Sequence, residues 1–174
     1  MKKIYFDMDG VLVDFEPSFL KATGGITHND DSMVYRAVTK LVSQTDFFKT
    51  LPVHPAFFKL VIIMQQCWTQ GIEIHILTSL GKHWNMDRGV KTYANKIAWL
   101  AEHLDPHFTN YVFHVVPDAN DKHRYGDANS FLIDDRQDNC EGFCKHGGMA
   151  HQFEGNADDL VQDLAKFVYN PKQL

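Results

Sequence analysis

Two aspartates end the first apolar segment of the chain, in the stretch KIYFDMDGVLVDFE. Asp7 and Asp9 are two residues apart, so both side chains leave an extended backbone on the same side. One interpretation is a plain turn, because aspartate favours turns after a strand. The alternative is a metal site, because two like charges repel each other unless a divalent cation lies between them, and carboxylate oxygens suit Mg²⁺. The metal interpretation needs partners elsewhere in the chain.

Polar residues also end two later apolar segments, and a lysine lies between these segments. IEIHILTS ends in Thr78 and Ser79, SFLIDDR carries Asp134 and Asp135 at its end, and Lys122 lies in the preceding connection. In an open parallel sheet the carboxyl ends of the strands line one crevice, so these groups would meet the two N-terminal aspartates. Several carboxylates need a cation, whereas hydroxyls and a lysine suit an anion. The pattern therefore predicts a site for a metal ion and a phosphate together.

Alternating strand and helix signals predict an α/β fold, a Rossmann-like parallel sheet flanked by helices. We expect strands at 4–6, 72–79, 109–116, 130–136 and 149–153, and helices at 55–70, 90–104 and 158–169. Residues 17–49 carry no good strand pattern and are interpreted as a small helical cap inserted after the first strand. The α/β core would then comprise 1–16 and 50–174.

The composition indicates one globular domain with a small insert. The chain has 174 residues, of which 44% are hydrophobic and 22% charged, and its net charge is -5. This charge argues against broad contact with a nucleic-acid backbone but leaves small anionic substrates open. The chain shows neither a signal segment nor the run of about 20 apolar residues that a membrane span needs. We therefore expect a cytoplasmic protein that does not bind membranes, and a homodimer is compatible with these data.

The three cysteines give no disulfide framework. Cys67, Cys140 and Cys144 are an odd number, and none belongs to a CxxC pair. Cys140 and Cys144 could form a zinc site with His146 and His151, but their spacing matches no standard zinc module. We therefore interpret these four residues as scattered surface and core positions.

The polar motifs resemble those of a known family. DMDGV, ILTS, Lys122 and LIDD are similar, in order, to the four motifs of the haloacid dehalogenase (HAD) superfamily of phosphatases. Together with FFKTLPVHP and KIAWLAEHLDPHF, they make the chain most similar to the 5'(3')-deoxyribonucleotidases, which dephosphorylate nucleoside monophosphates. The resemblance implies a Mg²⁺-dependent phosphomonoesterase that forms an aspartyl-phosphate and takes a small nucleotide as its substrate.

The resemblance also assigns roles to the carboxylates. Asp7 would be the nucleophile that attacks phosphorus, and Asp9 would act as general acid and then general base. Mg²⁺ would be held by Asp7, Asp134 and the backbone carbonyl of Asp9, with Asp135 as a further ligand or a neighbour of the ligands.

Hydroxyl and lysine side chains would hold the phosphoryl group. The resemblance implies this role for Thr78, the backbone amide of Ser79 and Lys122. Lys82 and Lys96 are further candidates. Lys96 falls in an expected helix, where a solvated face or a structural contact is the alternative interpretation.

Three aromatic residues are candidates for contact with a nucleobase. Phe15, Phe47 and Phe48 lie in regions from which the nucleotidases place aromatic rings against the base, and core packing is the competing explanation. Arg136 would balance the charge of the neighbouring aspartates. The chain has Asn120 where the nucleotidases carry an arginine that helps to set substrate choice, so the base and sugar preferences stay open.

Two other functions remain in consideration. One is a HAD phosphatase of another small phosphorylated metabolite. The other is a relative that binds and sequesters a nucleotide, for example a signalling nucleotide.

Overall fold

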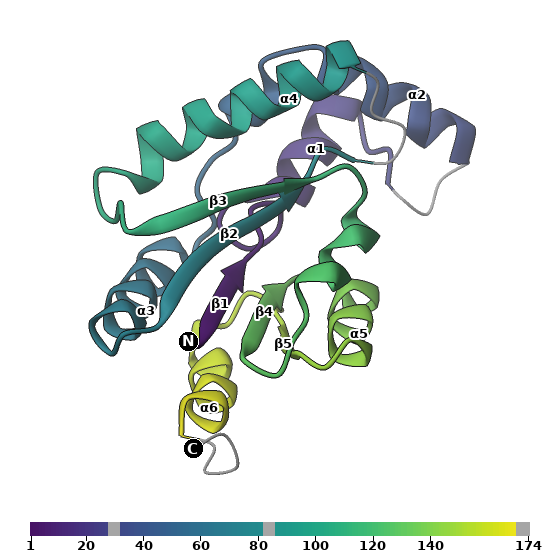
Figure 1. Cartoon of the computed structure of the whole chain (residues 1–174). Coiled ribbons are helices and arrows are strands. Elements are labelled where there is room, and N and C mark those ends of the chain that lie inside the picture. The colour runs from purple at the N-terminus through teal and green to yellow at the C-terminus, as the bar shows by residue number, and fades with distance from the viewer. Residues whose placement is uncertain (28–31, 82–85, 170–174) are drawn as a thin grey trace.

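The computed structural model describes residues 1–27, 32–81 and 86–169 and has a single five-stranded sheet (Figure 1). All neighbouring strands are parallel, in the order β3-β2-β1-β4-β5. The strands are β1 (Lys3–Phe6), β2 (Glu73–Ser79), β3 (Tyr111–Val116), β4 (Ser130–Asp134) and β5 (Met149–Gln152). The predicted α/β fold with a Rossmann-like sheet is confirmed.

Helices connect the strands and cover the sheet. They are α1 (Phe15–Thr23), α2 (Ser32–Ser43), η1 (Phe47–Lys49), α3 (Phe57–Thr69), α4 (Met86–Trp99), η2 (Leu100–Leu104), η3 (Ala119–Tyr125), α5 (Gln137–Lys145) and α6 (Ala157–Val168). Here η1 and η3 are 3₁₀ helices, and η2 is a π-helical turn that continues α4. No helix within the three described ranges is long and apolar enough to cross a membrane.

The predicted elements differ from the observed ones by up to four residues at their ends, and two of these differences are described here. The helix expected at 90–104 begins earlier, at Met86, and its last five residues form the π-helical turn. The strand expected at 130–136 ends at Asp134, because the Asp134 carboxylate accepts a hydrogen bond from the Arg136 amide at 3.0 Å and the chain turns there into α5.

The order of the strands places a topological switch point between β1 and β4. From β1 the chain moves to β2 and β3 on one side, and then returns to form β4 and β5 on the other side. The Asp7 amide donates to the Ile133 carbonyl at 2.9 Å, which ties the two strand ends together. Ligands of open α/β sheets bind outside the carboxyl ends of the strands at such a point.

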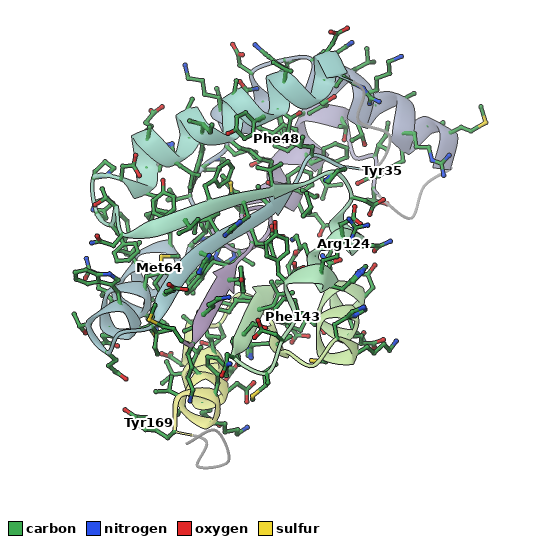
Figure 2. All side chains as sticks on the ribbon, in the orientation of Figure 1. Tyr35, Phe48, Met64, Arg124, Phe143 and Tyr169 are labelled. Atoms are coloured by element: carbon green, nitrogen blue, oxygen red, sulfur yellow. The ribbon has the colours of Figure 1, made fainter. Side chains whose placement is uncertain are left out.

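Both faces of β1 are buried, which fixes the position of the residues that follow it. Ile4 and Phe6 belong to the larger core cluster, which includes residues of α3 and α6. Tyr5 points to the opposite face and packs with Phe143 of α5, which lies between this helix and the sheet (Figure 2). Asp7 therefore follows a strand that is held from both sides.

The residues expected to form an insert are helical. Helices α1 and α2 lie beyond the carboxyl ends of β1 and β2, and α2 contacts α4 (Figure 1). Helix α1 begins at Phe15 and so crosses the boundary expected at residue 17. The division into a core and a cap stays a prediction.

Candidate active site

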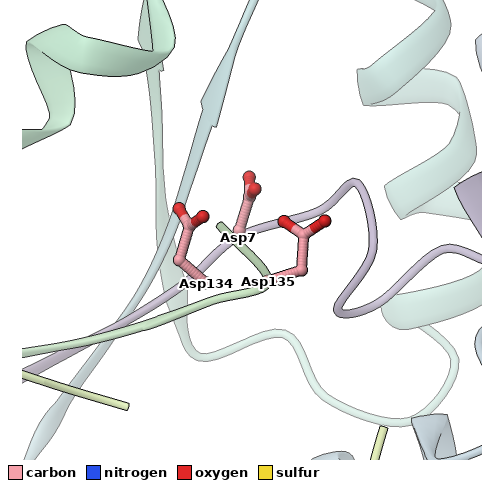
Figure 3. A group of neighbouring side chains, drawn as sticks. All are labelled: Asp7, Asp134 and Asp135. Atoms are coloured by element: carbon pink, nitrogen blue, oxygen red, sulfur yellow. The ribbon is translucent and has the colours of Figure 1, made fainter. Parts of the chain in front are cut away.

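Three carboxylates meet at the switch point and point in the same direction (Figure 3). Asp7 follows β1, Asp134 is the last residue of β4, and Asp135 comes directly after it. One oxygen from each carboxylate lies within 4.8 Å of the others. Asp7 and Asp134 are buried, whereas Asp135 is exposed at the rim. The structure thus brings together three of the predicted metal ligands.

Lys122 bridges two of these carboxylates from η3. Its ammonium Nζ lies 2.7 Å from Asp7 Oδ2 and 2.6 Å from Asp134 Oδ2, and the residue is only 1% exposed. Burial by itself would lower the pKa of Lys122, but the two carboxylates outweigh it and raise the pKa above its usual value. The lysine is therefore a fixed positive charge beside Asp7.

The surroundings of Asp7 and Asp135 disfavour the ionised form of their carboxyl groups and raise their pKa values. Burial raises the pKa of Asp7 to about 8, opposed by Lys122 and reinforced by the neighbouring carboxylates. The pKa of Asp135 rises to about 7, because its carboxyl group lies against Gly10, where it is desolvated although the residue as a whole is exposed, and because it faces Asp134. Lys122 alone thus does not neutralise this group of side chains.

Asp134 is oriented by the first turn of α5. Its Oδ1 accepts a hydrogen bond from Asn139 Nδ2 at 2.9 Å, in addition to the bond from the Arg136 amide. Asn139 was not among the predicted site residues, although its position five residues after Asp134, early in the following helix, was a usable signal. The Arg136 guanidinium pairs with Asp138 at 2.5 Å, so it balances the charge of the candidate ligands only from a distance.

Asp9 has a lysine partner of its own. Lys96 of α4 places Nζ 2.7 Å from Asp9 Oδ2 and 2.8 Å from Thr78 Oγ1. Lys96 is buried, so its interpretation as part of a solvated face is wrong. Asp9 Oδ1 is buried and has no hydrogen-bond partner among the described residues. The three-carboxylate group does not include Asp9, whose carboxylate pairs with Lys96 and keeps one oxygen without a hydrogen-bond partner in the part of the chain that the structure describes.

Gly10 allows the two strand ends to approach each other. Its φ of +79° lies in the left-handed region, and a Cβ at this position would collide with the Asp135 carboxyl group. The loop is closed by the Met8 carbonyl, which accepts hydrogen bonds from the amides of Leu12 and Val13, both at 2.9 Å. A glycine after the second aspartate is thus a steric requirement of the site.

The site carries more negative than positive groups. Four carboxylates lie there, from Asp7, Asp9, Asp134 and Asp135, against the two ammonium groups of Lys96 and Lys122. Two negative charges stay unbalanced when all six groups are ionised. A divalent cation has the charge, and hard carboxylate oxygens have the chemistry, that this arrangement needs.

Three aromatic rings, here called the aromatic wall, lie together, and one of them lies next to Lys96. The wall consists of Phe15, Phe47 and Phe48, all partly buried against the core. The ring centroids of Phe15 lie 6.0 Å from Phe47 and 6.1 Å from Phe48. Lys96 Nζ lies 5.0 Å from the centre of the Phe48 ring, which is close to α4 (Figure 2). The wall thus begins one side chain away from Asp9.

The other predicted site residues lie in β2, in η3 and outside the described residues. Thr78 is fully buried at the end of β2, bonded to Lys96, and Ser79 is half-buried beside it. Asn120 lies in η3, where its backbone amide donates a hydrogen bond to Asp118 Oδ1 at 2.9 Å. Lys82 lies outside the described residues.

Comparison with known proteins identifies the fold. No protein-family model and no curated protein sequence matches the chain. A magnesium complex of a HAD family enzyme from Bacteroides thetaiotaomicron has a TM-score of 0.54 and 13% identity, over 93% of this chain and 98% of that chain. A complex of the same enzyme with magnesium and inorganic phosphate has a TM-score of 0.50 and 13% identity, over 90% and 96%. These likenesses confirm the HAD-like fold that the motifs predicted.

Proposed function

We propose that the chain is a magnesium-dependent phosphatase that hydrolyses the phosphomonoester of nucleoside monophosphates. The observation that carries the phosphatase proposal is the convergence of Asp7, Asp9, Thr78 and two buried lysines at the switch point of a HAD-like sheet. Carboxylates for a cation and donors for an anion meet there within hydrogen-bonding distance of one another.

Asp7, Asp134 and Asp135 would hold Mg²⁺, with the backbone carbonyl of Asp9 as a further ligand. All three side chains offer the hard oxygen atoms that this ion prefers, and their excess negative charge matches its charge. When bound, Mg²⁺ would neutralise charge on the phosphoryl group and on the carboxylates. The HAD family enzyme from Bacteroides thetaiotaomicron, solved with magnesium and inorganic phosphate, supports this assignment.

With Mg²⁺ bound, the side chains of the site would carry out a two-step hydrolysis. The Asp7 carboxylate attacks phosphorus and forms an aspartyl-phosphate, while Asp9 gives its proton to the departing alkoxide. Asp9 then takes a proton from a water molecule that attacks the aspartyl-phosphate, so that inorganic phosphate leaves and Asp7 is regenerated. Thr78, the backbone amide of Ser79 and Lys122 hold phosphoryl oxygens during both steps, and Lys122 also orients Asp7.

The aromatic wall supports a nucleotide substrate. Nucleobases stack on aromatic side chains, and the wall lies beside Lys96, which itself contacts Asp9. A phosphoryl group on Asp7 and a flat base on the wall would fit one small ligand. Phe15 also stacks on Phe48 and Phe19, so these rings have packing partners without a ligand. This observation favours a phosphorylated metabolite without a nucleobase as the second candidate substrate.

A phosphate-release screen tests the proposal. The panel comprises nucleoside 5'- and 3'-monophosphates and sugar phosphates, each with Mg²⁺. We expect hydrolysis of nucleoside monophosphates with a higher kcat/KM than of any sugar phosphate. Hydrolysis of sugar phosphates alone would favour the metabolite phosphatase, and tight nucleotide binding without turnover would favour a sequestering protein.

Substitution of Phe15 separates base contact from core packing. We expect Phe15→Ala to lower kcat/KM for nucleoside monophosphates by about tenfold to a hundredfold, because base stacking is worth about 1–3 kcal/mol. The value for ribose 5-phosphate should change much less. Phe58→Ala, at a 58% exposed ring on α3, is the control. An equal loss for both substrates, with a lower melting temperature, would show that Phe15 is only a core residue.

A further inference from the structure

We infer that Asn95 of α4 is a positioning residue that fixes the aromatic wall at a set distance from the phosphate end of the site. Through this role it favours substrates that carry a flat base. The selectivity rests on the proposed function, whereas the positioning can be measured without it.

Helix α4 holds the chain segment 45–51, which carries two rings of the wall. Residues 91, 95 and 99 are spaced by four and so lie along one face of the helix. Each makes one contact with the segment: Lys91 Nζ with Asp46 Oδ1 at 2.5 Å, Asn95 Nδ2 with the Thr45 carbonyl at 2.9 Å, and Trp99 Nε1 with the Leu51 carbonyl at 2.7 Å.

The contact of Asn95 is the one that acts on the wall. Asn95 is only 4% exposed, so its amide depends on a protein partner. That partner, Thr45, also accepts a hydrogen bond from the Phe47 amide through Oγ1 at 3.1 Å. The Lys91 pair is exposed and therefore weak, and Trp99 binds the segment beyond the wall, at Leu51. Asn95 is thus connected to Phe47, the first residue of η1, through Thr45 alone.

The same turn of α4 reaches the phosphate end of the site. Lys96, the next residue, contacts Asp9 and Thr78 and lies under the Phe48 ring. One rigid helical turn therefore holds both ends of the site. It holds the wall through Asn95, and it holds Asp9, the proposed general acid, through Lys96. Because a helix does not stretch, the distance between the two ends of the substrate site is set by α4 itself.

Loss of this bond should affect one class of substrate. A displacement of the wall would weaken contact with a base, whereas a phosphate without a base would still meet Asp7, Asp9 and Lys96 in their places. A purely structural role predicts instead a lower stability with equal losses for all substrates.

The first arm of the experiment is kinetic and compares Asn95→Leu with wild type. Leucine has a similar shape and lacks the amide donor. We expect KM for nucleoside monophosphates to rise by about tenfold. For ribose 5-phosphate, both kcat and KM should stay unchanged. The matched control is Thr92→Val on the same helix, because Thr92 is buried and its Oγ1 has no hydrogen-bond partner among the described residues. Equal changes for both substrates in Asn95→Leu would overturn the selectivity.

The second arm measures amide hydrogen exchange and needs no substrate. The amides of Lys49 and Thr50 donate to the Asp46 carbonyl at 2.9 and 3.1 Å within the held segment. Their exchange should accelerate in Asn95→Leu and stay at the wild-type rate in Thr92→Val. Unchanged exchange in Asn95→Leu would overturn the positioning role. If the wild type hydrolyses no monophosphate while exchange accelerates, the proposed function fails and the positioning role stands.

Discussion

Lys122 is buried between Asp7 and Asp134, and its ammonium group is the charge partner of both carboxylates. Taking charges out of water is expensive, so a buried ion pair stabilises little by itself, but removal of one partner leaves the other charge uncompensated. Three carboxylates share this region with a single bridging lysine. The local balance of charge is therefore a constraint on stability as well as on chemistry.

We expect Lys122→Met to lower the free energy of unfolding by about 3 kcal/mol in EDTA, because two buried carboxylates lose their charge partner. Lys145→Met is the control, since Lys145 is exposed and its pair with Glu141 is long at 3.9 Å. Urea unfolding of both variants checks the expectation. A loss for Lys122→Met as small as that for the control would contradict the assigned role of this lysine.

Residue identity and spacing were enough to predict the groups at the strand ends, but not how they pair. Asp7 and Asp134 follow apolar strands, so the topology of a parallel sheet brings them together. Lys96 could not be assigned in this way, because nothing local shows that a lysine of a helix reaches across to Asp9. The collision that excludes a side chain at Gly10 likewise involves Asp135, which is remote in the sequence.

At the level of the elements, β2 and β3 are joined by an unusual pair of histidines. His75 Nδ1 and His114 Nε2 lie 2.8 Å apart, and the ring of Tyr5 lies 4.7 Å from that of His75. Burial lowers the pKa of both histidines, and Lys3 lowers both further, while Glu73 partly opposes the shift at His75. The neutral state is therefore favoured for both rings, and their mutual hydrogen bond requires that at least the accepting ring be neutral.

This pair predicts the direction of a pH effect on stability. A histidine of the unfolded chain titrates near its usual pKa of about 6.5, so below this pH the unfolded state binds protons that the folded state resists. The free energy of unfolding should fall as pH decreases from about 6.5. We expect His114→Gln to reduce this slope and His107→Gln, at an exposed position, to leave it unchanged. Equal slopes for His114→Gln and wild type in urea unfolding would contradict the account.

The elements themselves were largely predictable, and their ends were not. Apolar runs bounded by polar residues identified all five strands, since buried parallel strands give continuous apolar patterns. The end of β4 depends on a hydrogen bond from the Arg136 amide to Asp134, and the last turn of α4 is π-helical. Such ends are decided by single contacts rather than by a periodic pattern.

For the whole molecule, the order of the strands is what makes one site from distant residues. The chain crosses from one side of β1 to the other between β3 and β4, so that Asp7 and Asp134 end adjacent strands although they are far apart in the sequence. The net charge of -5 is concentrated in part at this point. An anionic substrate can approach such a site only when cations there offset the carboxylates.

The most direct test of the account is phosphate release by wild type and Asp7→Asn, each with Mg²⁺ and with EDTA. Asparagine keeps the shape of the side chain but removes the attacking carboxylate. We predict release from nucleoside monophosphates by the wild type with Mg²⁺, and none by the wild type in EDTA or by Asp7→Asn in either condition. Equal release by Asp7→Asn, or by the wild type in EDTA, would contradict hydrolysis through Asp7 at a magnesium site.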